Sequence, residues 1–205
     1  MKGKNTGPFL FVLLGALTAF GPFVTDMYLP SLPSMVGYFN TQASMVQLGL
    51  TSSMIGLALG QLFFGPLSDR YGRRSPLLAA MALFIVSTVC CLLSTSIESF
   101  IFFRLIQGVA GAGGIVVSRS IATDLFTGKD LAKAMAIIGA INGVAPVASP
   151  VLGGFLTDSI GWKGIFMVLL VIGFLLLLGN LYFKESLPVD LRKRGSVKGL
   201  LTTFG

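Results

Sequence analysis

The sequence lacks histidine altogether and carries few charged residues of either sign. Asp, Glu, Lys and Arg make up 11% of the 205 residues, whereas hydrophobic residues make up 54% and the mean hydropathy is +0.86. A soluble domain of this length needs more polar surface than this to cover its core. The shortage of charge therefore excludes a soluble globular protein and indicates a protein that lies in a lipid bilayer.

Other absences exclude most site chemistry. The two cysteines, Cys90 and Cys91, are adjacent in an apolar run, so they cannot form a structural disulfide there and are expected to face lipid or the core. No metal-ligand or catalytic cluster occurs, and no G-x-x-x-x-G-K-[ST] motif for a nucleotide is present. We therefore expect no enzyme, no metal and no cofactor.

What the sequence has in abundance is long apolar runs. A helix needs about 20 apolar residues to cross a bilayer. Six runs meet this length and predict an all-α membrane protein with six transmembrane helices, at about 8–29, 46–67, 75–97, 99–118, 134–157 and 164–183. We expect residues 1–187 to form one bundle and 188–205 to begin a basic cytoplasmic loop. The longest outer loop is expected at 26–44, where prolines end the first helix.

The basic residues alternate between the loops in a strongly uneven way. Lys163 alone falls on one side and Arg104 falls within a helix. The other thirteen fall on the opposite side: Lys2, Lys4, Arg70, Arg73, Arg74, Arg119, Lys129, Lys133, Lys184, Arg192, Lys193, Arg194 and Lys198. This distribution follows the positive-inside rule and predicts that both termini are cytoplasmic. The net charge of +7 is thereby assigned to the membrane surface and not to nucleic acid.

The loop after the second predicted helix, "GPLSDRYGRR", concentrates charge at a sharp turn. Asp69 and Arg73 are spaced i,i+4, so they can pair on one helix face, and Gly72 allows backbone angles that other residues resist. An ordinary orientation-setting loop would explain the arginines, but it would explain neither Asp69 nor the glycine.

The same loop has an echo further along the chain. Leucine, a hydroxyl residue, aspartate, glycine and a cation recur at an offset of 89 residues, so that Asp69 matches Asp158 and Gly72 matches Gly161. Three predicted helices separate the copies, which places them on opposite sides of the membrane. Such an echo is expected from two three-helix repeats of inverted topology, a feature of transporters, although chance is an alternative.

Two opposite charges fall at similar depth near the outer side. Arg104 lies inside the fourth predicted helix, where a charge is costly unless it faces the protein interior. Asp26 lies near the outer end of the first. We expect the two to pair, with snorkelling to the headgroups as the alternative for each. Asp26 is the only carboxylate clearly within or bordering a span rather than in a charged loop, which makes it the best candidate for a proton site.

The fifth predicted helix has a face of small and kink-forming residues. Six of them fall within an arc of about 100° when placed 100° apart: Gly139, Gly143, Pro146, Pro150, Gly153 and Gly154. Such a face allows close packing and bending. Ordinary tight packing is the alternative, and it accounts for the glycines better than for the two prolines.

These motifs together resemble one family. The loop "GPLSDRYGRR" resembles the cytoplasmic signature of the major facilitator superfamily, "RLIQG" its fourth-helix pattern and "ASPVLGG" its antiporter signature. The segments "TDMYLPSLP" and "RSIATDLF" resemble the bicyclomycin-resistance (Bcr/CflA) type of drug/proton antiporter. The resemblance implies roles in proton coupling for Arg104 and Gln107. It also implies a cytoplasmic latch of Gly65, Asp69, Arg70, Gly72, Arg73, Arg74 and Asp124.

The resemblance further implies what the chain does. Members have twelve helices, so this chain resembles the N-terminal half of a protein whose C-terminal six-helix half is missing. The implied function is proton-driven efflux of small amphipathic drugs by alternating access, in the bacterial inner membrane. Two alternatives stay open, a proton-coupled nutrient importer on the same fold and a six-helix membrane module for binding or assembly.

Overall fold

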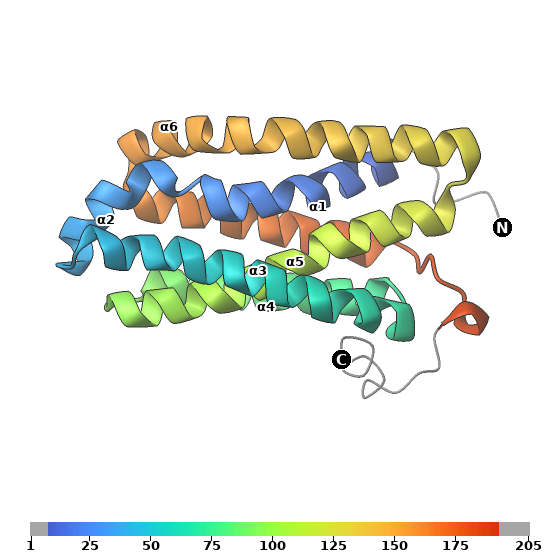
Figure 1. Cartoon of the computed structure of the whole chain (residues 1–205), viewed down its shortest axis with the longest axis horizontal. Helices are drawn as coiled ribbons and strands as arrows, with labels where there is room; N and C mark the ends of the chain where they lie inside the picture. The colour runs from blue at the N-terminus through green and yellow to red at the C-terminus, as the bar shows by residue number, and fades with distance from the viewer. Residues whose placement is uncertain (1–7, 193–205) are drawn as a thin grey trace.

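The computed structural model describes residues 8–192, which form a bundle of long helices that run along a common direction (Figure 1). The elements are α1 (Pro8–Asp26), η1 (Leu29–Ser31), α2 (Leu32–Phe39), α3 (Ala43–Tyr71), α4 (Arg74–Leu93), α5 (Ile97–Leu125), α6 (Gly128–Tyr182) and η2 (Val189–Leu191). Within the described residues, five helices are long and apolar enough to cross a membrane. Lys2, Lys4, Lys193, Arg194, Lys198 and most of the predicted loop 188–205 lie outside the described part of the chain.

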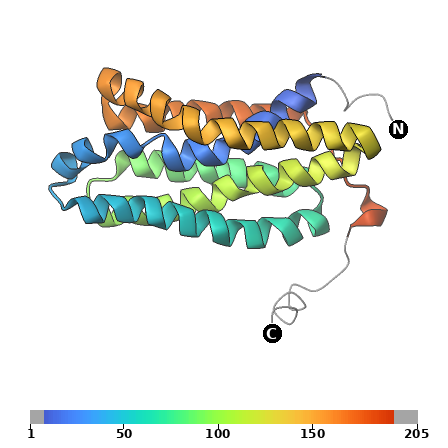
Figure 2. The same cartoon turned by 45° about the horizontal axis from the view of Figure 1, so that its top comes forward.

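Helix α6 contains two of the predicted spans. Its 55 residues, at about 1.5 Å each, are far longer than the roughly 30 Å core of a bilayer. The helix breaks at Gly161, where φ is 72° and ψ is 179°. In Figures 1 and 2 the chain turns back there, so the yellow-to-orange first limb and the orange-to-red second limb run in opposite directions. With the four other spans, the two limbs provide the six predicted passes.

The two turns that the sequence echo predicts share one backbone conformation. Gly72, between α3 and α4, has φ 88° and ψ 170°, close to the values at Gly161. Both values lie in a region that favours glycine, because a Cβ would clash there. The α3–α4 turn and the turn within α6 lie at opposite ends of the bundle (Figure 1). This correspondence favours the inverted repeat.

The helices differ from the predicted spans mainly at their ends. Helix α3 covers 43–71 where 46–67 was predicted, and α5 covers 97–125 where 99–118 was predicted. Hydropathy marks only the part of a helix within hydrocarbon, and a helix continues into the charged region beyond it. The predicted loop 26–44 contains η1 and α2, and each has a proline in its first turn, where no backbone N–H is needed. The left-handed residue Asn40 (φ 48°) then ends α2.

The backbones of α3 and α5 approach most closely, and glycine makes this possible. A Cβ at Gly56 would overlap the carbonyl oxygen of Leu105, and one at Gly108 would overlap that of Ser53. These two helices share the most extensive interhelical contact of the described chain. Their contact fixes α5 against α3, and α5 carries the buried arginine of the candidate site.

Candidate functional site

A buried ion cluster joins the ends of three helices. Arg73, 6% exposed at the start of α4, donates from Nε to Asp124 Oδ2 on α5 over 2.7 Å and from Nη2 to Oδ1 over 3.2 Å. Its Nη1 donates to Asp69 Oδ1 at 2.6 Å and to Ser68 Oγ at 2.8 Å, both in the last turn of α3. Burial lowers the pKa of Arg73, but the bonds and charges of Asp124 and Asp69 outweigh it and raise the pKa above its ordinary value.

A third carboxylate binds the same turn through backbone N–H groups. Glu185, in the segment after α6, accepts hydrogen bonds from the backbone N–H groups of Arg73 (2.7 Å) and Arg74 (3.1 Å). It thereby caps the first turn of α4, whose N–H groups have no partner within the helix. A side chain at Gly72 would overlap the Glu185 carboxylate, so this position needs glycine for space as well as for its φ. We call Asp69, Arg73, Asp124 and Glu185 the inner-end cluster, because the charge distribution predicts that this end of the bundle is cytoplasmic.

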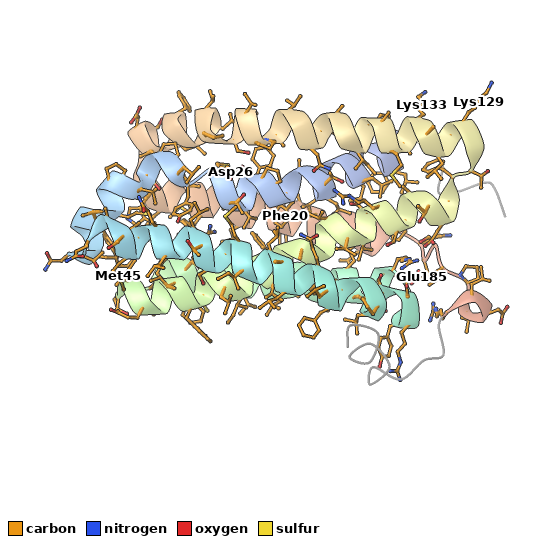
Figure 3. The ribbon with its side chains drawn as sticks, viewed as in Figure 1. Phe20, Asp26, Met45, Lys129, Lys133 and Glu185 are labelled. Carbon is orange, nitrogen blue, oxygen red and sulfur yellow. The ribbon has the colours of Figure 1, made fainter. Side chains whose placement is uncertain are left out.

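Sequence reasoning missed Glu185. The available signal was an acid directly after the last predicted span, beside Lys184 and in a basic stretch. The structure also ties this segment to α5, because Ser186 Oγ donates to Asp124 Oδ2 at 3.1 Å. Figure 3 shows Glu185 at the same end of the bundle as Lys129 and Lys133, with Met45 at the opposite end.

The other predicted latch residues lie around the cluster. Arg74 is half-buried, and its Nη2 donates to the Leu181 carbonyl at the end of α6 over 2.7 Å. Gly65 offers its carbonyl to Ser68 Oγ at 2.8 Å. Arg70 is exposed and lies over the ring of Tyr71, 5.3 Å from its centroid. The structure therefore brings Asp69, Arg73 and Asp124 together and places Arg70 outside their contacts.

Arg104 is fully buried in α5, and it holds the last turn of α1. Its Nη1 donates to Gln107 Oε1 at 2.6 Å, and its Nη2 donates to the Val24 carbonyl at 3.0 Å. Gln107 in turn donates to Thr88 Oγ1 on α4 at 2.7 Å. The guanidinium also lies 4.5 Å from the ring centroid of Tyr28. Arg104 thus connects α1, α4 and α5.

The predicted ion pair between Asp26 and Arg104 does not form in the structure. Among the described residues the structure records no ion pair for either side chain. Asp26 and Arg104 lie at similar depth, but depth does not determine the direction of a side chain around its helix. The step of two residues from Val24 to Asp26 rotates that direction by about 200°. The buried Val24 faces Arg104, whereas Asp26 is half-buried and lines a cavity.

That cavity has a volume of about 310 Å³ and lies between α1, α3 and α5. Among the described residues its wall is mostly apolar, and Asp26 is the only charged residue there. Figure 3 shows Asp26 within the length of the bundle, away from the end that carries Glu185. The lining of the cavity includes the polar residues Thr25, Asp26 and Gln61 and the apolar residues Leu57 and Ile115.

The small-residue face of α6 points away from the rest of the bundle. A Cβ at Gly139, Gly143 or Gly154 would meet nothing within 4 Å in the described structure. Gly153 is the exception, because a Cβ there would overlap the Met27 carbonyl after α1. Pro146 is exposed, and Pro150 is partly buried. The first limb stays helical through both prolines and breaks only at Gly161.

Comparisons with known proteins agree on one family. Residues 12–204 match the model of the Major Facilitator Superfamily. The "Uncharacterized MFS-type transporter YdgK" of Bacillus subtilis is 43% identical over 199 residues, which is 96% of this chain and 50% of the relative. The "Bicyclomycin resistance protein homolog" of Haemophilus influenzae is 36% identical over 176 residues, covering 84% of this chain and 44% of the relative.

A solved structure confirms the architecture. A D-xylose–proton symporter superposes with a TM-score of 0.76 at 17% identity, covering 96% of this chain and 52% of the symporter. This likeness concerns the fold alone. The chain spans about half the length of the curated relatives that it matches.

Proposed function

Because the chain belongs to the Major Facilitator Superfamily, a family of membrane transporters and not of enzymes, we propose that the whole protein exchanges small amphipathic drugs for protons by alternating access. The chain supplies the N-terminal half, and a C-terminal six-helix half supplies the opposite wall of the path. The similarity to a bicyclomycin resistance protein homolog supports drugs as the cargo. We place the protein in a bacterial inner membrane with both termini cytoplasmic, as the charge distribution favours.

One observation carries the proposal. Asp26 is the only charged residue on the wall of the cavity, and it lies two residues from the carbonyl that Arg104 holds. Protonation of Asp26 removes the only charge from that wall, so the cavity offers a different surface to a substrate in each protonation state. Arg104 and Gln107 fix the turn of α1 that carries Asp26, which is how they take part in proton coupling.

The inner-end cluster gives the transporter a device for alternating access. Its contacts join the ends of α3 and α5, the start of α4 and the segment after α6. Charge-assisted bonds of this kind are about twice as strong as neutral ones. We propose that the intact cluster favours the outward-open state, and that it opens when the path faces the cytoplasm.

The test is drug-induced proton movement in proteoliposomes that contain the intact transporter. Addition of drug should release protons from the wild type, and Asp26→Asn should abolish this exchange while insertion stays normal. The matched control is Glu98→Gln, an exposed acid in the first turn of α5. Wild-type exchange in Asp26→Asn would contradict the proposal. Proton movement together with the drug, in the same direction, would favour the importer.

A further inference from the structure

A carboxamide lies in the middle of an apolar helix, on an exposed surface. Gln61 lies in α3 and its side chain is exposed, as are those of its neighbours Leu62 and Phe63. The apolar side chains of leucine and phenylalanine are favourable in contact with lipid. An amide that faces hydrocarbon leaves its polar atoms without partners, which is strongly unfavourable. The face of α3 that carries Gln61 must therefore border a polar space.

The cavity is that space. Gln61 lines it from α3, and Asp26 and Thr25 line it from α1. Thr25 Oγ1 already donates to the Gly21 carbonyl at 3.2 Å, whereas the described part of the chain offers no hydrogen bond to the side chains of Gln61 and Asp26. One carboxylate and one carboxamide thus border a cavity that is otherwise apolar, and both keep their bonding capacity.

The lining determines which ligand fits. No basic residue lines the cavity, so an anion would meet the charge of Asp26 without compensation. A cation would pair with it, and the pair gains strength as water leaves the site. Leu57 and Ile115 provide an apolar surface for the body of the ligand, and a volume of about 310 Å³ is that of a small ligand pocket. The amide of Gln61 can both donate and accept a hydrogen bond.

We propose that this cavity is a substrate subsite for an amphipathic organic cation, in which Asp26 pairs with the ammonium group and Gln61 selects ligands that carry a hydrogen-bonding group on the apolar body. The inference rests on the proposed transport function and adds the chemical class of the cargo. It also gives Gln61, to which the motifs assign no role, the part of a specificity residue.

The test is equilibrium binding to the intact transporter in nanodiscs, without a proton gradient. Procainamide carries a protonated tertiary amine and an aromatic amide, and tetraphenylphosphonium is a cation without a hydrogen-bonding group. N-ethyl-4-aminobenzamide keeps the aromatic amide but lacks the protonated tertiary amine. We expect Asp26→Asn to weaken binding of both cations at least tenfold. Gln61→Leu should weaken procainamide about tenfold, the value of one hydrogen bond, and leave tetraphenylphosphonium within about twofold. The control Gln47→Leu, an exposed glutamine of α3 outside the cavity, should change neither.

Retained tetraphenylphosphonium binding shows that Gln61→Leu is folded, and the near-isosteric Gln61→Met repeats the test with less change of shape. Equal loss of both cations in these variants, or no loss, would overturn the role of Gln61. Binding of the uncharged benzamide as tight as that of procainamide would overturn the cation class. Because no gradient is present, these results are independent of the proton-exchange assay, so either proposal can fail alone.

Discussion

Arg104 carries its charge inside the bundle without a carboxylate beside it in the part of the chain that the structure describes. The buried charge is stabilised by hydrogen bonds to the oxygens of Gln107 and Val24 and by the faces of two aromatic rings. The ring of Tyr28 lies 4.5 Å away and that of Phe166 lies 5.7 Å away. A desolvated cation gains up to about 2 kcal/mol from such a ring. This arrangement compensates the arginine and leaves Asp26 available to the cavity.

Tyr28 is therefore predicted to matter through its ring. Tyr28→Leu should lower the free energy of unfolding by about 2 kcal/mol, because the guanidinium loses its nearest ring. Tyr28→Phe keeps the ring and loses the 3.3 Å bond from the hydroxyl to the Val46 carbonyl, so it should cost less than about 1 kcal/mol. Thermal unfolding in detergent compares the two. Equal costs would assign the role to the hydroxyl instead.

At the scale of elements, the start of α4 depends on a segment more than a hundred residues away. Glu185 supplies the cap that α4 lacks, since its N-cap residue Arg73 makes no side-chain cap of its own. Leu187 donates its backbone N–H to the same carboxylate at 3.0 Å, which fixes Glu185 in place. The inner end is thus held both by side-chain charges and by backbone groups.

Glu185→Gln should loosen this end without unfolding the bundle. The loss of charge weakens the two bonds from the backbone N–H groups of Arg73 and Arg74, each worth about 1.5–3 kcal/mol when charged. Amide hydrogen exchange in the first turn of α4 should accelerate by about tenfold or more, and the exchange of drug for protons should slow. Asp190→Asn, an exposed acid in η2, is the control. Unchanged amide hydrogen exchange in Glu185→Gln would show that the cap is dispensable.

The elements also show which features of the fold and the site can be predicted from the sequence. Hydropathy predicts the long apolar helices because apolar length is a local property, and the i,i+4 spacing predicts the contact of Asp69 with Arg73 because both lie at one turn. Glu185 was missed because no local pattern links it to a turn so distant in the chain. The pairing of Asp26 with Arg104 was wrong because sequence indicates depth along a helix better than direction around it. The helices at 29–39 were missed because prolines were interpreted only as helix breakers.

At the scale of the whole molecule, two surfaces of the bundle have no partner in the described chain. The glycine face of α6 meets nothing at Gly139, Gly143 and Gly154, and Gln61 lies exposed on α3. The relatives are about twice as long as this chain. We infer that a second six-helix half covers these surfaces and closes the cavity, as alternating access between two halves requires.

The most direct test of the account compares two proteins in liposomes, the 205-residue chain alone and the same chain continued by a C-terminal six-helix half. Drug uptake driven by a pH gradient is the measurement, with insertion checked for both. The account predicts saturable, gradient-dependent uptake only when both halves are present, because the chain alone provides one wall of the path. Saturable, gradient-dependent uptake by the 205-residue chain alone would contradict it and favour a self-sufficient six-helix module.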